Sequence, residues 1–405
     1  MNGYLFGTGS WFAVYGIHTV LFSWLVTMVL RESPESIGIA QAALLLPATL
    51  LLLVGGALGD RYGTARLAVL AQCGAVLPLL WLGALLVNDA LTFSGLIVYA
   101  LLLGTANAFL TPARDGLLNQ VAGGAVQRTV VKTSLAQFGS QMLGFGLAML
   151  ADTNGPVPLV ALQIALLLLG AWTISRLPVA FTPQPTGERF FRAIGRSLAE
   201  GARTVTARAE MRDVLLMNAA LGLFFMGSYI VTLPILVREN YSTDSTALAL
   251  MNMVNAAGLF VMIAGLLRFG VVARPGRAVL IAHVVGAIVL AGCALEVPFP
   301  LFLLFVFAWG LAGGVAMSMS RTVMQELAPA AQRARVMSFF AVTMMGAGPI
   351  GALFAGYLSE TLGARTALVV CCVSMFSFSA TMLRVSAVAR LTLDGTGEGH
   401  QSGSG

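Results

Sequence analysis

Residues 38–66 read GIAQAALLLPATLLLLVGGALGDRYGTAR. No charged side chain occurs in this stretch before Asp60, and nearly every residue up to position 58 is apolar. The hydrocarbon core of a bilayer is about 30 Å thick, and a helix crosses it with roughly 20 apolar residues. The stretch therefore predicts a membrane-spanning helix that ends in a charged turn.

The whole chain has the composition of a membrane protein. Of its 405 residues, 58% are hydrophobic and only 10% are charged, whereas a soluble domain carries roughly 25% charged residues. The apolar runs are continuous rather than alternating, which indicates helices and not barrel strands, because a helix satisfies its own backbone polar groups in lipid. The expected spans are 9–30, 38–58, 67–87, 91–111, 133–151, 157–175, 213–237, 246–269, 277–297, 299–320, 336–358 and 363–384.

The spans divide six and six around one long polar stretch. We expect an all-α membrane protein with 12 transmembrane helices, built from two six-helix bundles in a pseudo-twofold arrangement, at 1–175 and 213–390, with a disordered cytoplasmic tail at 391–405. The two halves repeat a polar pattern after their fourth helices: Arg114, Gln120, Gln127 and Arg128 in the first half, and Arg321, Gln325, Gln332 and Arg333 in the second. Repeated halves with a site between them at mid-membrane are a transporter architecture.

The basic residues predict how the chain sits in the membrane. With a cytoplasmic N-terminus, 20 of the 23 Lys and Arg residues fall on the inner side, and only Arg31, Arg238 and Arg365 fall outside. This asymmetry predicts that both termini are cytoplasmic, in the inner membrane of a bacterium. The arginines are spread over short loops, which argues against a nucleic-acid partner.

The polar stretch 176–212 is expected to be a cytoplasmic linker that contains an amphipathic helix. Phe191, Ile194, Leu198 and Val205 follow helical spacing, and an arginine stripe lies on the opposite side. Such a helix suits the surface of an anionic membrane. The alternative is a solvated linker helix that does not touch lipid.

The turn after the second span carries a recognisable motif. Residues 55–66 read GGALGDRYGTAR, and this glycine-x-leucine-x-aspartate-arginine-x-glycine pattern resembles the signature of the major facilitator superfamily. The resemblance implies a conformational latch that closes the cytoplasmic side, formed by Asp60, Arg61, Gly63 and Arg114. The equivalent loop of the second half, GLLRFG at 265–270, has no aspartate. The alternative is a turn whose charges only fix the topology.

Two further stretches point to a narrower branch. TPAR at 111–114 and PIG at 349–351 resemble the bacterial siderophore-exporter and macrolide-efflux-like branch of that superfamily. The fifth span reads GSQMLGFG at 139–146, without the glycine-proline pair that many drug/proton antiporters carry there. This departure puts antiport in doubt.

Ionisable groups are nearly absent from the span centres. His18, in the first span, is the exception and the candidate for proton coupling, because its ordinary pKa suits proton exchange. A neutral histidine that hydrogen-bonds to a neighbouring helix is an equally good interpretation. His283, on the ninth span, is expected at the supporting periphery, and Asp152, Glu296 and Glu360 in water at outer helix ends.

The family resemblance implies a central cavity lined mainly by the first, fourth, seventh and tenth helices. For every candidate, bonding or packing between helices is the alternative. The candidate substrate-cavity residues are Tyr15, His18, Asn107, Gln137, Gln141, Asn218, Tyr229, Asn252 and Asn255, with Phe22, Phe225 and Trp309 as further aromatic wall.

These features favour a secondary active transporter that moves a small amphipathic or hydrophobic molecule by alternating access, as an exporter and with protons as a candidate coupling ion. A lysophospholipid or lipid flippase of the same fold and a nutrient uptake carrier are the alternatives. The three histidines are dispersed and no metal-ligand spacing occurs, so we expect no enzyme, no catalytic residues, no metal and no cofactor. The expected partners are the small-molecule substrate and the lipid bilayer, and the expected state is a monomer.

Overall fold

The computed structural model describes residues 1–122, 126–178, 190–269, 272–329 and 332–392. Within these ranges all regular secondary structure is helical, and eleven helices are long and apolar enough to cross a membrane. The remaining span is the fifth along the chain, helix α6 (Val126–Ala148). It packs between α1 and α12 as a spanning helix would. Its first turns carry Gln127, Arg128 and Lys132 and are therefore less apolar than the other spans. The predicted fold of twelve helices in two bundles is confirmed.

The first half contains six spans, one of them broken in two at Ala75. Its remaining elements are α1 (Asn2–Trp24) with a π-helical extension η1 (Leu25–Val29), α2 (Pro34–Tyr62), α3 (Thr64–Gly74), α4 (Val76–Val87), α5 (Phe93–Val121), the short α7 (Ala151–Asn154) and α8 (Pro156–Ser175).

The second half follows the linker helix α9 (Phe190–Thr206). Its seventh span is one continuous rod made of α10 (Ala209–Ala220), the π-helical segments η2 (Leu221–Met226) and η3 (Ser228–Thr232), and α11 (Leu233–Asn240). The rest consists of α12 (Ser245–Phe269), α13 (Pro275–Ala291), η4 (Gly292–Ala294), α14 (Phe299–Leu327), α15 (Arg333–Leu362), α16 (Ala364–Val385) and η6 (Val388–Arg390).

Helix ends follow from local sequence. Ser33 caps α2 by accepting a hydrogen bond from the Ser36 amide at 3.2 Å, with Pro34 at the first helical position. Gly63 turns the chain between α2 and α3 with φ +94°, a conformation that favours glycine. Gly155 and Gly363 have φ +76° and +80° and join the fifth span to the sixth in each half, so the halves share this turn as well.

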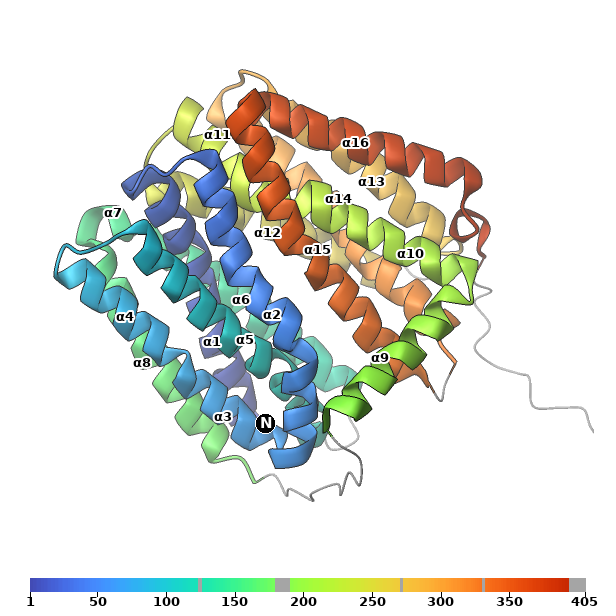
Figure 1. The fold of residues 1–405 in the computed structure, drawn as a ribbon, viewed down its shortest axis with the longest axis horizontal. Helices are drawn as coiled ribbons and strands as arrows, with labels where there is room; N and C mark the ends of the chain where they lie inside the picture. Colours follow the sequence, from blue (N-terminus) through green and yellow to red (C-terminus); the bar gives the residue numbers. More distant parts are fainter. Residues whose placement is uncertain (123–125, 179–189, 270–271, 330–331, 393–405) are drawn as a thin grey trace, which may run out of the picture.

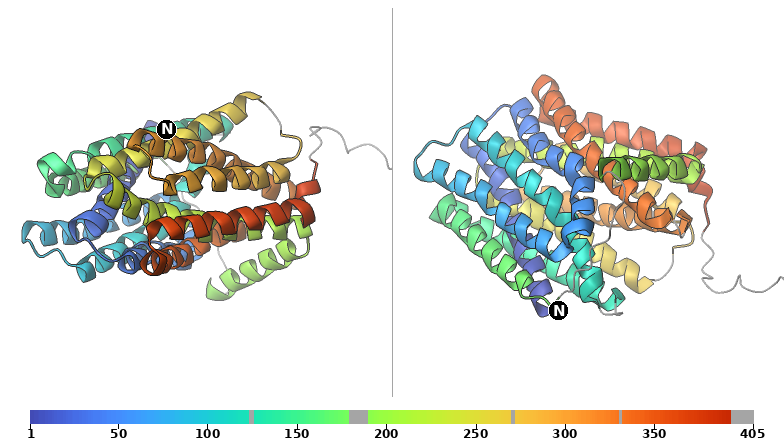
Figure 2. Two further views of the ribbon diagram at one scale, coloured as in Figure 1. Left: turned by 90° about the horizontal axis from the view of Figure 1, so that it is seen from above. Right: turned by 60° about the horizontal axis from the view of Figure 1, so that its bottom comes forward.

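The two bundles meet along two helix pairs. Helix α2 packs against α15, and α6 against α12, so each half contributes its second and fifth spans to the contact. We call the face with the start of α1, helix α9 and the end of α16 the terminal face, and the opposite face the distal face. The bundles lie together toward the distal face and diverge toward the terminal face, where α9 runs between α2 and α15 (Figures 1 and 2).

The linker helix packs on protein. Val205 is fully buried in the core of the second half, and the Thr204 hydroxyl donates to Gln332 Oε1 at 2.5 Å. The other side chains of the predicted apolar stripe, at 191, 194 and 198, lie outside the described side chains. Binding of this helix to lipid stays a prediction.

Glycines allow the helices of each half to touch backbone to backbone. A Cβ added at Gly16 of α1 would lie 2.4 Å from the Gln141 carbonyl oxygen of α6, and one added at Gly144 would lie 2.3 Å from the Ala13 oxygen. Contacts of this kind are typical of membrane helices, where small residues permit close approach.

We predict that Gly144→Ala destabilises the protein by about 2 kcal/mol, because the added methyl group must push α1 away from α6. Thermal unfolding in detergent measures this. The matched control is Gly146→Ala on the same helix, since a Cβ there meets nothing within 4 Å. Equal melting temperatures for the two variants would show that the contact does not carry stability.

Candidate functional site

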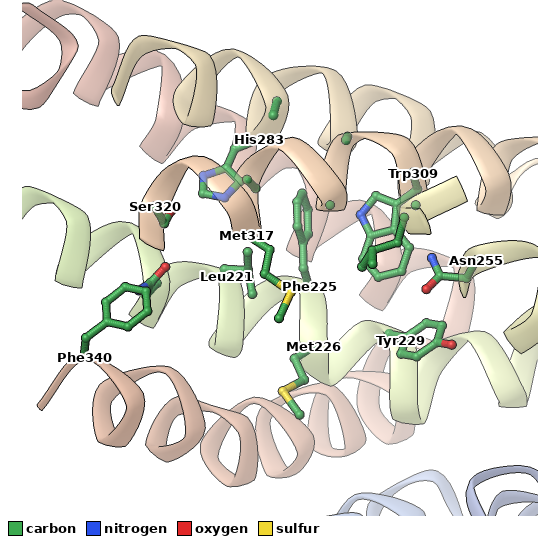
Figure 3. Close-up of a pocket in the computed structure, with 17 residues that line it drawn as sticks. Leu221, Phe225, Met226, Tyr229, Asn255, His283, Trp309, Met317, Ser320 and Phe340 are labelled. Carbon is green, nitrogen blue, oxygen red and sulfur yellow. The ribbon is translucent and has the colours of Figure 1, made fainter. Parts of the chain in front are cut away.

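A cavity of about 180 Å³ lies inside the second half. Its walls come from the seventh span, α12, α13, α14 and α15, so it lies near the middle of the membrane-spanning region (Figure 3). Among the described residues, four aromatic side chains and two methionines line it together with leucine, alanine and glycine, and four polar residues lie among them. The side chains labelled in Figure 3 are Leu221, Phe225, Met226, Tyr229, Asn255, His283, Trp309, Met317, Ser320 and Phe340.

Two local features of the backbone open this cavity. The seventh span is π-helical over η2 and η3, and these segments carry Phe225, Met226 and Tyr229. π-Helical turns are rare and recur at functional sites, because they widen the helix and redirect its side chains. On the facing helix α14, Gly310 and Gly313 line the cavity, and a Cβ added at Gly313 would meet only open space.

The aromatic rings of the cavity pack in an ordered chain. Phe225 stands edge-on to both Trp309 and His283, with ring centroids 5.8 and 6.2 Å apart. Tyr229 lies 5.4 Å from Trp309, and its hydroxyl donates to Asn252 Oδ1 at 2.7 Å. This network fixes the side chains on one side of the cavity.

Polar atoms without partners also line the cavity. His283 is 1% exposed, and neither ring nitrogen finds a hydrogen-bond partner among the described residues. The amide nitrogen of Asn218 is likewise buried without a partner in this part of the chain. By contrast, the Asn255 amide lies 3.5 Å from the Val306 carbonyl.

The structure thus gathers some of the predicted cavity residues and separates others. Asn218, Tyr229 and Asn255 line the cavity, and Asn252 supports Tyr229 from behind. His18 is buried in the first half, where its Nδ1 lies 2.8 Å from the Tyr99 hydroxyl on α5. That contact matches the alternative of a histidine bonded to a neighbouring helix.

The remaining candidates lie in the first half, away from this cavity. Tyr15 is half-buried on α1, with its ring centroid 6.3 Å from that of His18. Asn107 accepts a hydrogen bond from Thr111, one turn along α5, at 3.1 Å. Gln137 and Gln141 are half-buried on α6. A substrate role for these residues stays a prediction.

The predicted latch residues lie on or near the terminal face. The side chain of Asp60 is outside the described side chains. Arg61 is exposed and lies beside the ring of Tyr62, while Arg114 turns inward, with its guanidinium carbon 4.5 Å from the centre of the Phe12 ring. The latch role stays a prediction, and the bundles diverge on this face in the present conformation.

Hydrogen bonds between described residues of the two halves gather toward the distal face. Asp152, just after α6, accepts from the Ser245 amide at 3.0 Å and hydroxyl at 2.7 Å, and from the Thr246 amide at 3.3 Å. A carboxylate at this helix start also meets the positive end of the α12 dipole. Asp152 therefore fastens the first half to the start of α12.

Arg238 makes a second contact between the halves, this time from a side chain of the second half to the first half. It belongs to α11 in the second half, and its Nη1 donates at 3.1 Å to the carbonyl oxygens of Thr27 and Glu32 at the end of the first span. Nearby, a Cβ added at Gly38 of α2 would lie 2.6 Å from the Ala352 oxygen of α15. These contacts form what we call the distal closure, defined by Asp152, Arg238 and the Gly38 contact.

Sequence reasoning missed three residues of this arrangement. Asp152 is exposed, as expected, but the sequence did not show that it also bonds across the halves. Arg238 was assigned only to the outer side. His283 was expected at the periphery, and that expectation is wrong because its ring reaches the cavity. One signal was available for His283: residues 310–316 of α14 read GLAGGVA, which leaves room beside the ring.

A sequence profile described as Major Facilitator Superfamily matches residues 4–352, most of the chain. The chain belongs to this superfamily. No curated protein matches the sequence as a whole.

Solved structures of transporters share the fold of this major facilitator protein. Nucleoside transporter NupG is 14% identical, with a TM-score of 0.69 over 96% of this chain and 100% of that one. A bacterial homologue of the human lysosomal transporter Spinster, in an inward-facing and unoccupied conformation, is 15% identical, with a TM-score of 0.66 over 95% and 94%. An autoinhibited POT family peptide transporter is 14% identical, with a TM-score of 0.74 over 96% of each chain. At these identities the likeness establishes the fold alone.

The distal closure gives a prediction about the resting conformation. In a Glu35→Cys/Glu360→Cys protein, a short thiol cross-linker should join the halves efficiently, because the Glu35 amide lies 3.5 Å from the Glu360 carboxylate. Adding Asp152→Ala and Arg238→Ala should lower the cross-linking yield at least threefold, since both fastenings are lost. A protease site inserted at 179–189 allows the chain to be cut between the halves. On a gel, cross-linked halves then run as one band and separate halves as two.

Arg365→Ala is the matched control. Arg365 is also a distal arginine, but it pairs with Glu296 and Asn240 inside the second half, and it holds the pKa of the Glu296 carboxyl below its usual range. An unchanged yield in the double alanine variant, or an equal drop in the control, would contradict the assigned closure.

Proposed function

We propose that this protein is a secondary carrier that moves a small, uncharged and largely apolar molecule across a membrane by alternating access. One observation carries the proposal: a mid-membrane cavity of a major facilitator protein is lined by aromatic and methionine side chains, with no Asp, Glu, Lys or Arg among the described lining residues. Such a lining favours an apolar ring over a carboxylate or phosphate, which would require buried arginine.

The proposal includes export from a bacterial cytoplasm. The distal closure holds the halves together on one face, so a solute would reach the cavity from the terminal face, which the arginine distribution predicts to be cytoplasmic. The likeness to the siderophore-exporter and macrolide-efflux-like branch, carried by residues 111–114 and 349–351, points in the same direction. We also propose that the protein is a monomer in the inner membrane, with both termini on the cytoplasmic side.

The cavity size bears on the alternative of a lipid flippase. A volume of about 180 Å³ exceeds only modestly the roughly 150 Å³ of a cavity known to hold benzene. This favours a molecule of one or two rings over a lipid with a long acyl chain.

Proton coupling is the part of the proposal that rests on His18. It is buried at mid-depth in α1 and bonded to Tyr99, and its Nε2 has no partner among the described residues. A proton exchanged there would change the charge of a helix that reaches the contact between the halves. A pH gradient would then bias the two conformations.

Transport in proteoliposomes tests the function. A panel of uncharged aromatic solutes should include at least one that crosses faster with the protein than without it, and Trp309→Ala should lower that rate at least tenfold by removing a cavity wall. Trp172→Ala is the matched control, because Trp172 lies on α8 with 57% of its surface exposed. Equal losses in both variants, or no solute transported, would contradict a carrier that uses this cavity.

The same assay with a pH gradient tests coupling. Wild type should accelerate with the gradient, and His18→Ala should transport without responding to it. A response that survives His18→Ala would remove His18 from the coupling step.

Asp60→Asn should slow transport in the same assay, and a normal rate in that variant would contradict the latch role of Asp60.

A further inference from the structure

His283 occupies an unusual place for a polar side chain. It lies halfway along α13, the ninth span, and this helix packs against α14 and α16 rather than against the first half. Its ring nevertheless points away from lipid and toward the cavity, where Figure 3 shows it beside the space between α14 and the seventh span. The ring is 1% exposed.

Both nitrogens of this ring lack partners in the described part of the chain. Buried polar groups in proteins are nearly always hydrogen-bonded, so each exception needs an explanation. Phe225 meets the ring edge-on and offers no hydrogen-bonding atom. Asn218, on the seventh span, adds a second unpaired donor to the same cavity.

The backbone around His283 is shaped to keep it at the cavity wall. One turn further along α13, a Cβ added at Gly286 would already touch Ala312, Phe225 and Trp309 at 3.4 to 3.5 Å. These are ordinary van der Waals distances, so the two aromatic rings and Ala312 pack directly beside α13 at this turn. The imidazole is therefore held in place by neighbours that contribute shape but no polar partner.

We propose that His283 and Asn218 form a hydrogen-bonding subsite that recognises a hydroxyl or similar neutral polar group on a small aromatic ligand. This inference rests on the proposed function and names the ligand chemistry of the same cavity. A neutral imidazole presents one donor and one acceptor, which a hydroxyl matches, and the Asn218 amide supplies further donors. The aromatic and methionine walls would hold the flat, apolar part of the ligand.

The size of the cavity limits the ligand to one or two fused rings. A pair of matched probes isolates the polar group: naphthalene, and 2-naphthol, which adds one hydroxyl to the same ring system. Binding of each is measured by isothermal titration of the full-length protein in lipid nanodiscs, with empty nanodiscs subtracted. The readout is the ratio of the two dissociation constants.

Wild type should bind 2-naphthol at least tenfold more tightly than naphthalene, as expected for one well-formed hydrogen bond in an apolar site. His283→Phe keeps an aromatic ring but removes both nitrogens and leaves Asn218 in place, so the ratio should fall at least threefold while naphthalene binding is unchanged. His283→Gln restores a donor and an acceptor and should recover part of the ratio. A purely structural role of His283 would change the binding of both probes together.

Gln163→Leu is the matched control. Gln163 is fully buried on α8 in the first half and also carries an unpaired oxygen, but it lies outside the cavity. This variant should keep the wild-type ratio. A wild-type ratio near one, as expected if water satisfies His283 and Asn218, would overturn the subsite, as would an unchanged ratio in His283→Phe.

The two levels of the proposal can fail separately. Binding in nanodiscs does not require transport, so a ratio that depends on His283 upholds the subsite even where no solute crosses the membrane. If transport depends on Trp309 but the ratio of dissociation constants is the same in wild type and His283→Phe, the carrier proposal is supported and the subsite is overturned.

Discussion

Glycines bring the helices of this protein into backbone contact, at Gly16 with Gly144 in the first half and at Gly258 with Gly310 in the second. Helices surrounded by lipid gain little from hydrophobic burial against one another, so close packing must supply much of their association. The same device operates between the halves, where Gly38 of α2 meets α15. A contact made of backbone and small side chains can separate without exposing buried charge. That property would suit the opening and closing of the interface in the proposed transport cycle.

Around this contact, polar groups are distributed unevenly. Asp152 and Arg238 hold the halves together at the distal face with hydrogen bonds to backbone groups at helix ends. Deeper in the membrane, Thr49 donates to the Met345 carbonyl at 3.1 Å. Toward the terminal face the bundles diverge (Figure 1). The cavity lies beside this divergence and within one half, so one bundle supplies its walls.

The sequence predicted the features that depend on long apolar runs or on the conformation of a single residue. Twelve spans were expected from composition, and eleven helices meet the length and hydropathy of a span, while α6 is more polar; the charged turn after the second span was also expected and lies at Gly63. The cavity could not be located in this way, because π-helical turns over Leu221–Met226 depend on tertiary packing and leave no clear sequence signal. His283 was misplaced for a related reason: helix order in the family implies periphery, whereas the small residues of α14 decide how deep the ring reaches.

The central claim is that the two bundles rock about their contact so that one face opens as the other closes. Spin-label distances in nanodiscs test it directly, with one label pair at Ala90 and Leu295 on the distal face and another at Arg176 and Arg390 on the terminal face, all on exposed positions of opposite halves. Two populations are expected, one with the two distances of this structure and one with a longer distal and a shorter terminal distance. A single unchanging distance on each face across pH and added ligand, or two distances that lengthen together, would contradict alternating access.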